Sequence, residues 1–188
     1  MTEQAPSEDP RPEELRVAKS LLLVNTGNGK GKSTAAFGTM LRAVAQDWPV
    51  AVLQFIKSGD WKVGEETIGR RLGVHWEALG EGFTWDSDDI THDREVAAKA
   101  WAKAKAIIEA GHHRLVILDE LTYLLTWNWI DQGEVLAVLV NRPENVTVVV
   151  TGRDAPQELI DIADTVTEMC EIKHAYQAGI AAKKGIDF

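Results

Sequence analysis

The stretch Thr26-Gly27-Asn28-Gly29-Lys30-Gly31-Lys32-Ser33 decides the fold, because it joins an apolar run to a helical pattern. The apolar run is residues 21–24, and the helical pattern covers residues 33–45. Glycines adopt backbone angles that other residues avoid, so successive N–H groups of such a turn can point at one anion. The N-terminus of the following helix adds the positive end of its dipole. The stretch therefore predicts a phosphate-binding loop of the P-loop type between a strand and a helix.

Two side chains at the end of this loop have the chemistry that a nucleotide requires. Lys32 can reach the outer phosphates, and Ser33 can ligate a Mg²⁺ ion. The general pattern has a glycine at the position of Thr26, and here Gly27 and Gly29 supply the flexibility instead. The alternative is a turn rich in glycine and lysine that binds nothing, but the flanking strand and helix favour phosphate binding.

The remainder of the chain alternates short apolar runs with longer helical patterns. The expected strands are residues 21–24, 50–53, 74–79, 115–118, 146–150 and 165–172. The expected helices are residues 33–45, 93–110 and 131–141, with a further helix that opens at 154–156. Apolar strands interleaved with helices predict an α/β fold, with a mostly parallel sheet of about six strands and helices on both faces. The last strand is half polar, so we expect it near an edge.

The chain divides into a tail and one domain. Residues 1–18 are acidic and rich in proline, and we expect a flexible tail or a short helix there. Residues 19–188 are expected to form a single P-loop domain, a size that can bury one core without cross-links.

Two carboxylates follow the most apolar strand. Ligands of open parallel sheets bind outside the carboxyl ends of the strands, where Asp119 and Glu120 lie. A carboxylate at this place can hold Mg²⁺ opposite Ser33. Adjacent residues on a strand point to opposite sides, so we do not expect both to contact one ion. The alternative is that the pair only caps the next helix.

Seven tryptophans are many for 188 residues, and core packing accounts for most of them. Trp76 and Trp101 lie in expected secondary structure and are predicted to be buried. Phe83 and Trp85 stand among glycines and acidic residues, so we expect a loop that acts either as a lid or as a contact for a planar ligand. The single cysteine, Cys170, is expected to be a small buried apolar group.

Composition excludes several classes of function. The net charge of −9 argues against a nucleic-acid footprint. No run of about 18 apolar residues is present, so no membrane-spanning helix is expected. One cysteine allows neither a disulfide within the chain nor a multi-cysteine zinc site, and a cytoplasmic location is the simplest expectation.

Seven segments, in this order, resemble a known family. They are TGNGKGKSTAAFGTMLRA, VLQFIK, GFTW, VILDELTYLL, NRPENVTVVVTGR, DIADTVTE and KHAYQAGIAAKKGIDF. Together they cover nearly the whole chain after the tail. The chain resembles the P-loop type corrinoid adenosyltransferases, which act on cob(I)alamin or cob(I)yrinic acid a,c-diamide. Threonine at the position of Thr26 is itself typical of that family.

The resemblance implies a RecA-like P-loop NTPase fold and a transferase. The implied reaction is attack by Co(I) of the corrinoid on the ribose C5′ of ATP, with release of triphosphate, in adenosylcobalamin biosynthesis or salvage. It also implies Mg²⁺ or Mn²⁺, a homodimer, and flavodoxin or another reduced-flavin electron donor. Which corrinoid is preferred stays open.

The resemblance also implies site residues. Those expected to contact the nucleotide are Gly27, Asn28, Gly29, Lys30, Gly31, Lys32, Ser33 and Thr34, together with Arg42 and Arg153. Ser33 and Glu120 would hold the metal ion, with Asp119 nearby. Phe83 and Trp85 match the aromatic residues that displace the lower axial ligand of the corrinoid, and with Lys32 they are the expected catalytic residues.

Two other functions fit the same loop. A nucleoside kinase or an ATP hydrolase would release ADP, although the zinc-bearing kinds of thymidine kinase are disfavoured by the single cysteine. A non-catalytic carrier would bind nucleotide and corrinoid without reaction. Only adenosyl transfer produces a light-sensitive Co–C bond.

Overall fold

The sheet has six strands in the order β3-β2-β4-β5-β1-β6, and every neighbouring pair is parallel. The computed structural model describes residues 14–57, 63–81 and 90–187. The predicted α/β fold, with about six parallel strands, is confirmed. Residues 14–18 form no helix, and the division into tail and domain stays a prediction.

Strands and helices alternate through most of the chain. The strands are β1 (Leu22–Thr26), β2 (Val50–Gln54), β3 (His75–Ala78), β4 (Leu115–Asp119), β5 (Thr147–Thr151) and β6 (Thr165–Glu168). The helices are α1 (Lys32–Val44), α2 (Gly64–Arg71), α3 (Ile90–Ala110), α4 (Leu121–Thr126), α5 (Gln132–Val140), α6 (Gln157–Ile162) and the 3₁₀ helix η2 (Ala175–Ala178).

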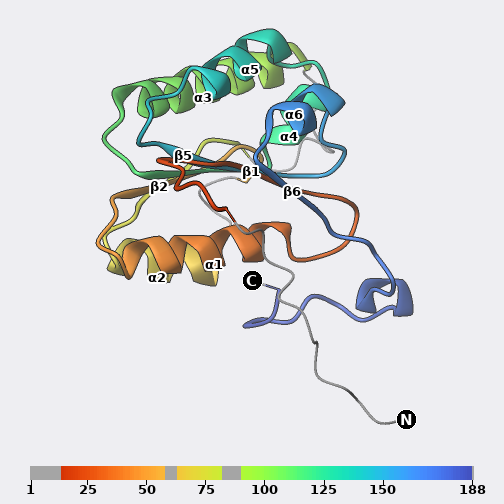
Figure 1. Ribbon diagram of the computed structural model, residues 1–188. Coiled ribbons are helices and arrows are strands. Elements are labelled where there is room, and N and C mark those ends of the chain that lie inside the picture. The colour runs from red at the N-terminus through yellow and green to blue at the C-terminus, as the bar shows by residue number, and fades with distance from the viewer. Residues whose placement is uncertain (1–13, 58–62, 82–89, 188) are drawn as a thin grey trace.

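Helices cover both faces of the sheet, with α1 and α2 on one side and α3 to α6 on the other (Figure 1). The strands therefore bury both of their faces, which explains their continuous apolar runs. In β4, Val116 and Leu118 pack in the cluster with α3 to α6, whereas Leu115 and Ile117 pack with α1. Successive side chains of a strand point to opposite faces of the sheet, so β4 contributes to the hydrophobic core on each face.

Several local expectations can be compared with the structure. Trp76 and Trp101 are buried, as predicted. The expected strand 165–172 ends at Glu168, lies at the sheet edge and is exposed along its length. Two short helices, α2 and α4, were not expected. The sequence of α2 is polar with a glycine at each side of its centre, and α4 is too short to show a helical period.

The expectation for Cys170 was wrong, because its side chain is exposed. It lies two residues after the end of β6, where the chain leaves the edge of the sheet. Among the described residues, no helix is long and apolar enough to cross a membrane.

Candidate nucleotide site

Residues 27–31 form the turn that connects β1 to α1. Gly27 has φ of 92° and Gly31 has φ of 115°, in the left-handed region that favours glycine. Gly31 is the N-cap of α1, so the helix begins at Lys32. The first N–H groups of a helix have no partner within it, and here they lie in the wall of a pocket.

The C-terminal segment packs directly on this loop. The Gly29 N–H donates to the Met169 carbonyl at 2.6 Å, and the Met169 N–H donates to the Thr26 carbonyl at 2.8 Å. A Cβ atom on Gly29 would lie 2.6 Å from the Met169 carbonyl oxygen, which explains why glycine stands there. The amide of Gly29 therefore serves this packing, and the amides after it remain available to an anion.

Thr26 has a structural role that a glycine could not fill. Its Oγ1 accepts a hydrogen bond of 3.1 Å from the N–H of Ala155, in the turn that follows β5. This bond ties the end of β1 to the neighbouring strand end. The departure from the general P-loop pattern is thus explained by a contact that only a side-chain oxygen provides.

Lys32 lies over the loop with its ammonium group turned back. Its Nζ donates to the Gly29 carbonyl at 2.7 Å, while the Asn25 side chain donates to the Lys32 carbonyl at 3.2 Å. Burial lowers the pKa of Lys32, and the charge of Arg153 lowers it further, against the opposing charges of Glu120 and Asp154. Two cations therefore face the same space, and an anion bound there would be attracted by both.

Arg153 is positioned by a close contact between β5 and α4. The hydroxyl of Thr122 donates to the Arg153 carbonyl at 2.6 Å. Gly152 has φ of 141°, and a Cβ there would lie 1.9 Å from the Thr122 Oγ1 atom. The glycine before Arg153 is therefore required for this turn.

The two adjacent carboxylates have opposite surroundings. Asp119 is fully buried, and its Oδ1 and Oδ2 accept hydrogen bonds from Thr151 Oγ1 at 2.8 Å and Gln54 Nε2 at 2.9 Å. Glu120 is at the N-cap position of α4 with φ of 66°, but its side chain makes no capping hydrogen bond, and the residue lines the pocket. Burial, followed by the charge of Asp119, raises the pKa of Glu120 to about 7, against the attraction of Lys57, Lys32 and Arg153.

These groups meet in a pocket of about 250 Å³ at the carboxyl ends of the strands. Of the predicted residues, those that line it are Asn28, Gly29, Lys30, Gly31, Lys32, Ser33, Thr34, Glu120 and Arg153. Gly27 and Asp119 lie behind the wall. Phe83 and Trp85 fall outside the described residues.

Arg42 is not brought to this pocket. It is exposed in the last turn of α1. Ten residues of helix separate it from Lys32, which corresponds to about 15 Å along the helix axis.

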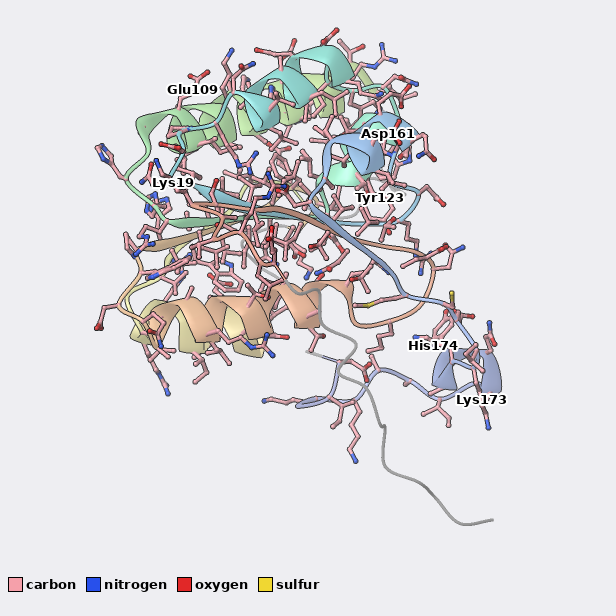
Figure 2. All side chains as sticks on the ribbon, in the orientation of Figure 1. Lys19, Glu109, Tyr123, Asp161, Lys173 and His174 are labelled. Atoms are coloured by element: carbon pink, nitrogen blue, oxygen red, sulfur yellow. The ribbon has the colours of Figure 1, made fainter. Side chains whose placement is uncertain are left out.

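The pocket is also lined by residues that motif analysis did not select, namely Phe37, Lys57, Val63, Glu65, Tyr123, His174 and Asp187. Lys57 follows the end of β2, so the rule that ligands bind at strand carboxyl ends could have found it. Figure 2 shows Tyr123 on α4 and His174 on the C-terminal segment, at the same side of the molecule. Asp187 forms an ion pair with Lys30 of the loop, and no local signal marks it because 157 positions separate the pair.

Comparison with known proteins identifies the family of the chain. The chain is 46% identical over 174 residues to a corrinoid adenosyltransferase of Sinorhizobium, covering 90% of this chain and 81% of that protein. It is 44% identical over 177 residues to one of Pseudomonas aeruginosa (93% and 87% coverage). It is 39% identical over 180 residues to one of Escherichia coli K12 (96% and 91% coverage). The family profile described as ATP:corrinoid adenosyltransferase BtuR/CobO/CobP matches residues 18–188. The chain therefore belongs to the ATP:corrinoid adenosyltransferase family.

Proposed function

We propose that this pocket holds the triphosphate of ATP while the enzyme transfers the adenosyl group to the cobalt of a corrinoid. The transferase activity follows from the family. One observation supports the assignment to this pocket. The phosphate loop after β1, Glu120 after β4 and Arg153 after β5 all line it.

The chemistry requires a site that stabilises a leaving group. The electron pair of Co(I) forms the Co–C5′ bond, the C5′–O bond breaks, and triphosphate departs with the bonding pair, so cobalt is formally oxidised from +1 to +3. Negative charge grows on the departing oxygen. In this proposal the loop amides, Lys32 and Arg153 stabilise that charge, and their lining of the same pocket supports the assignment. No general base is needed, because the cobalt supplies the electrons.

A divalent cation, Mg²⁺ or Mn²⁺, fits the donor set of the pocket. The Ser33 hydroxyl and the Glu120 carboxylate both line it. Both Asp119 oxygens already accept hydrogen bonds from protein groups, so we assign Asp119 an indirect role. The described residues hold no group of three or more His, Cys, Asp or Glu that could bind a metal. Such a sparse set is typical of Mg²⁺, which takes few protein ligands and shares phosphate oxygens. When bound, the ion would neutralise triphosphate charge.

The experiment that tests the function follows its two products. The protein is incubated with ATP, a reductant and cobalamin, and the formation of the Co–C bond is followed by its light-sensitive absorbance. Phosphorus NMR identifies the released phosphate compound. We expect adenosylcobalamin and triphosphate in equal amounts. ADP as the product would support phosphoryl transfer instead, and binding without product would support a carrier.

We also propose a homodimer that acts in the cytoplasm and receives electrons from flavodoxin or another reduced flavin. These expectations are supported by resemblance to the family. Phe83 and Trp85 are proposed, on the same ground, to displace the lower axial ligand of the corrinoid.

A further inference from the structure

Four buried polar side chains form a continuous hydrogen-bonded line across the sheet, beneath the pocket. Trp76 Nε1 on β3 donates to Gln54 Oε1 on β2 at 2.9 Å, and Gln54 Nε2 donates to Asp119 Oδ2 on β4 at 2.9 Å. Thr151 Oγ1 on β5 donates to Asp119 Oδ1 at 2.8 Å. All four residues are at most 2% exposed. We call these four residues the cross-sheet line.

The groups at the two ends of the cross-sheet line, the Trp76 indole and the Thr151 hydroxyl, fix the direction of every hydrogen bond in it. An indole N–H can only donate, so the Gln54 oxygen must face Trp76 and its NH₂ group must face Asp119. The Thr151 hydroxyl accepts the backbone N–H of Glu120 at 3.0 Å, so its own proton is directed to Asp119. Asp119 thus accepts at both oxygens, as an ionised carboxylate does, and Lys57 Nζ lies 3.6 Å from Oδ2.

The line ends on the backbone of the residue that faces the nucleotide pocket. Glu120 adopts φ of 66° and ψ of 22°, a left-handed conformation that residues with a Cβ avoid. The bond from its N–H to Thr151 holds this conformation at the start of α4. The backbone conformation of Glu120 sets the direction in which its side chain leaves the chain, next to the pocket that Lys32 and Ser33 also line.

We propose that Thr151 and Gln54 are positioning residues for Glu120. Thr151 acts directly, by accepting the Glu120 N–H, and Asp119 orients its hydroxyl. Gln54 acts through Asp119, and Trp76 orients the Gln54 amide. This inference rests on the proposed role of Glu120 in binding the triphosphate and its cation. Buried polar groups of this kind keep one geometry because every alternative leaves a donor or acceptor without a partner. Neither Gln54 nor Thr151 lines the pocket, so both act without touching substrate.

The test compares Thr151→Val, which has the same shape without the hydroxyl, with Thr151→Ser, which keeps it. Equilibrium binding of inorganic triphosphate is measured with and without Mg²⁺ by calorimetry, beside kcat, KM for ATP and the melting temperature. We expect Thr151→Val to weaken Mg²⁺-dependent binding at least tenfold and to raise KM, and Thr151→Ser to restore binding to within about threefold of the wild-type value.

A control separates positioning from simple loss of stability. Thr147→Val removes another hydroxyl from β5, one that accepts the Leu21 N–H at 3.2 Å at the opposite end of the strand. It should lower the melting temperature without changing triphosphate binding. If Thr151→Val binds like the wild type, or if Thr151→Ser is as impaired as Thr151→Val, the inference is overturned.

Two further variants keep the inference falsifiable. If Thr151→Val does not fold, Gln54→Met is the deciding variant, because it leaves Asp119 Oδ2 without its amide donor. It should weaken the same triphosphate binding about threefold or more, and wild-type binding would overturn the inference.

Glu120→Gln tests the role of Glu120 on which the inference rests. An impaired Glu120→Gln beside an unaffected Thr151→Val rejects only positioning, whereas an unaffected Glu120→Gln rejects the role of Glu120 itself.

Discussion

Asp119 and Glu120 are neighbours in the sequence, yet their carboxylates have different surroundings. Asp119 accepts hydrogen bonds from Gln54 and Thr151, whereas Glu120 lines the pocket. The alternation of side chains along a strand predicts that they diverge. It does not predict which one is satisfied internally, because Gln54 and Thr151 come from other strands. Lys32 and Ser33, by contrast, were predictable, since the glycines that place them are contiguous with them.

Lys32→Ala should reduce kcat/KM by a factor that corresponds to about 3 kcal/mol. Removing one preorganised hydrogen-bond donor to a developing negative charge has an effect of this size in other enzymes. Steady-state kinetics with saturating corrinoid measures the effect. Lys99→Ala, at an exposed position of α3, is the control and should retain wild-type kinetics. Unchanged kinetics in Lys32→Ala would remove this lysine from catalysis.

The raised pKa of Glu120 predicts a pH-dependent stability of the protein without nucleotide or metal. Between pH 4.5 and about 7 the folded state holds a proton that the unfolded state has lost, so the free energy of unfolding falls as pH rises. The loss is complete above pH 7 and amounts to at most about 3 kcal/mol.

Glu120→Gln cannot titrate, so it should be more stable than the wild type at pH 8, and this advantage should shrink toward pH 5. Urea unfolding in EDTA measures both proteins at each pH. Glu109→Gln on the exposed surface of α3 (labelled in Figure 2) should follow the wild-type profile. An advantage that does not vary with pH would contradict the assigned pKa.

Phe83 and Trp85 act on the corrinoid in our proposal, so their loss should spare ATP. Removal of an axial ligand raises the reduction potential of a metal centre, as in haem. The double variant Phe83→Ala with Trp85→Ala should bind ATP normally but slow adenosylation driven by a weak reductant. Normal turnover with a reduced-flavin donor would show that the two aromatic side chains have another role.

At the scale of elements, the phosphate loop is supported by two segments of the chain. One is α1, which continues from it, and the other is the chain after β6, which packs on it through Met169. The strand–loop–helix unit was predictable because its signal is local. The contact with Met169 was not, since it depends on β6 pairing with β1 at the edge of the sheet.

Gly29→Ala should therefore disturb the loop although the backbone angle is not the obstacle. The added Cβ would lie 2.6 Å from the Met169 carbonyl oxygen, and the required shift should cost about 1–3 kcal/mol, as other overpacking substitutions do. Denaturant unfolding and ATP titration should both show the loss.

Gly38→Ala is the matched control for this substitution. Gly38 lies inside α1, and apart from the backbone of its own helix and its chain neighbours no described atom lies within 4 Å of an added Cβ. The substitution should stabilise the protein by about 0.5–1 kcal/mol, because alanine is the better helix former. Equal stability changes in both variants would contradict the close contact at Gly29.

At the scale of the whole molecule, the C-terminal segment returns to the phosphate loop near the start of the domain. Figure 1 shows the C-terminal segment leaving the sheet beyond β6 and returning beneath α1. Its last described residue, Asp187, pairs with Lys30 and lines the nucleotide pocket. A protein carboxylate thus occupies the electrostatic environment that suits a phosphate, and the two anions would compete for Lys30.

Asp187→Asn should accordingly bind triphosphate more tightly, by up to about fivefold at low ionic strength, if this partly exposed ion pair is worth about 1 kcal/mol. The gain should vanish in high salt. Asp161→Asn on the exposed surface of α6 changes the net charge equally and should leave binding unaltered. Weaker binding in Asp187→Asn would show that this carboxylate supports the site.

The amino-acid sequence alone determined the phosphate loop, the parallel α/β plan and the family, because each depends on contiguous patterns of glycine, apolar and charged residues. Tertiary structure alone decided four outcomes. Both oxygens of Asp119 accept hydrogen bonds from other strands, Arg42 does not line the pocket, Cys170 is exposed, and Asp187 pairs with Lys30. Those outcomes depend on which strands are neighbours and in what register. That pairing is set by the free energy of the whole sheet and its two cores, and no short window of sequence contains it.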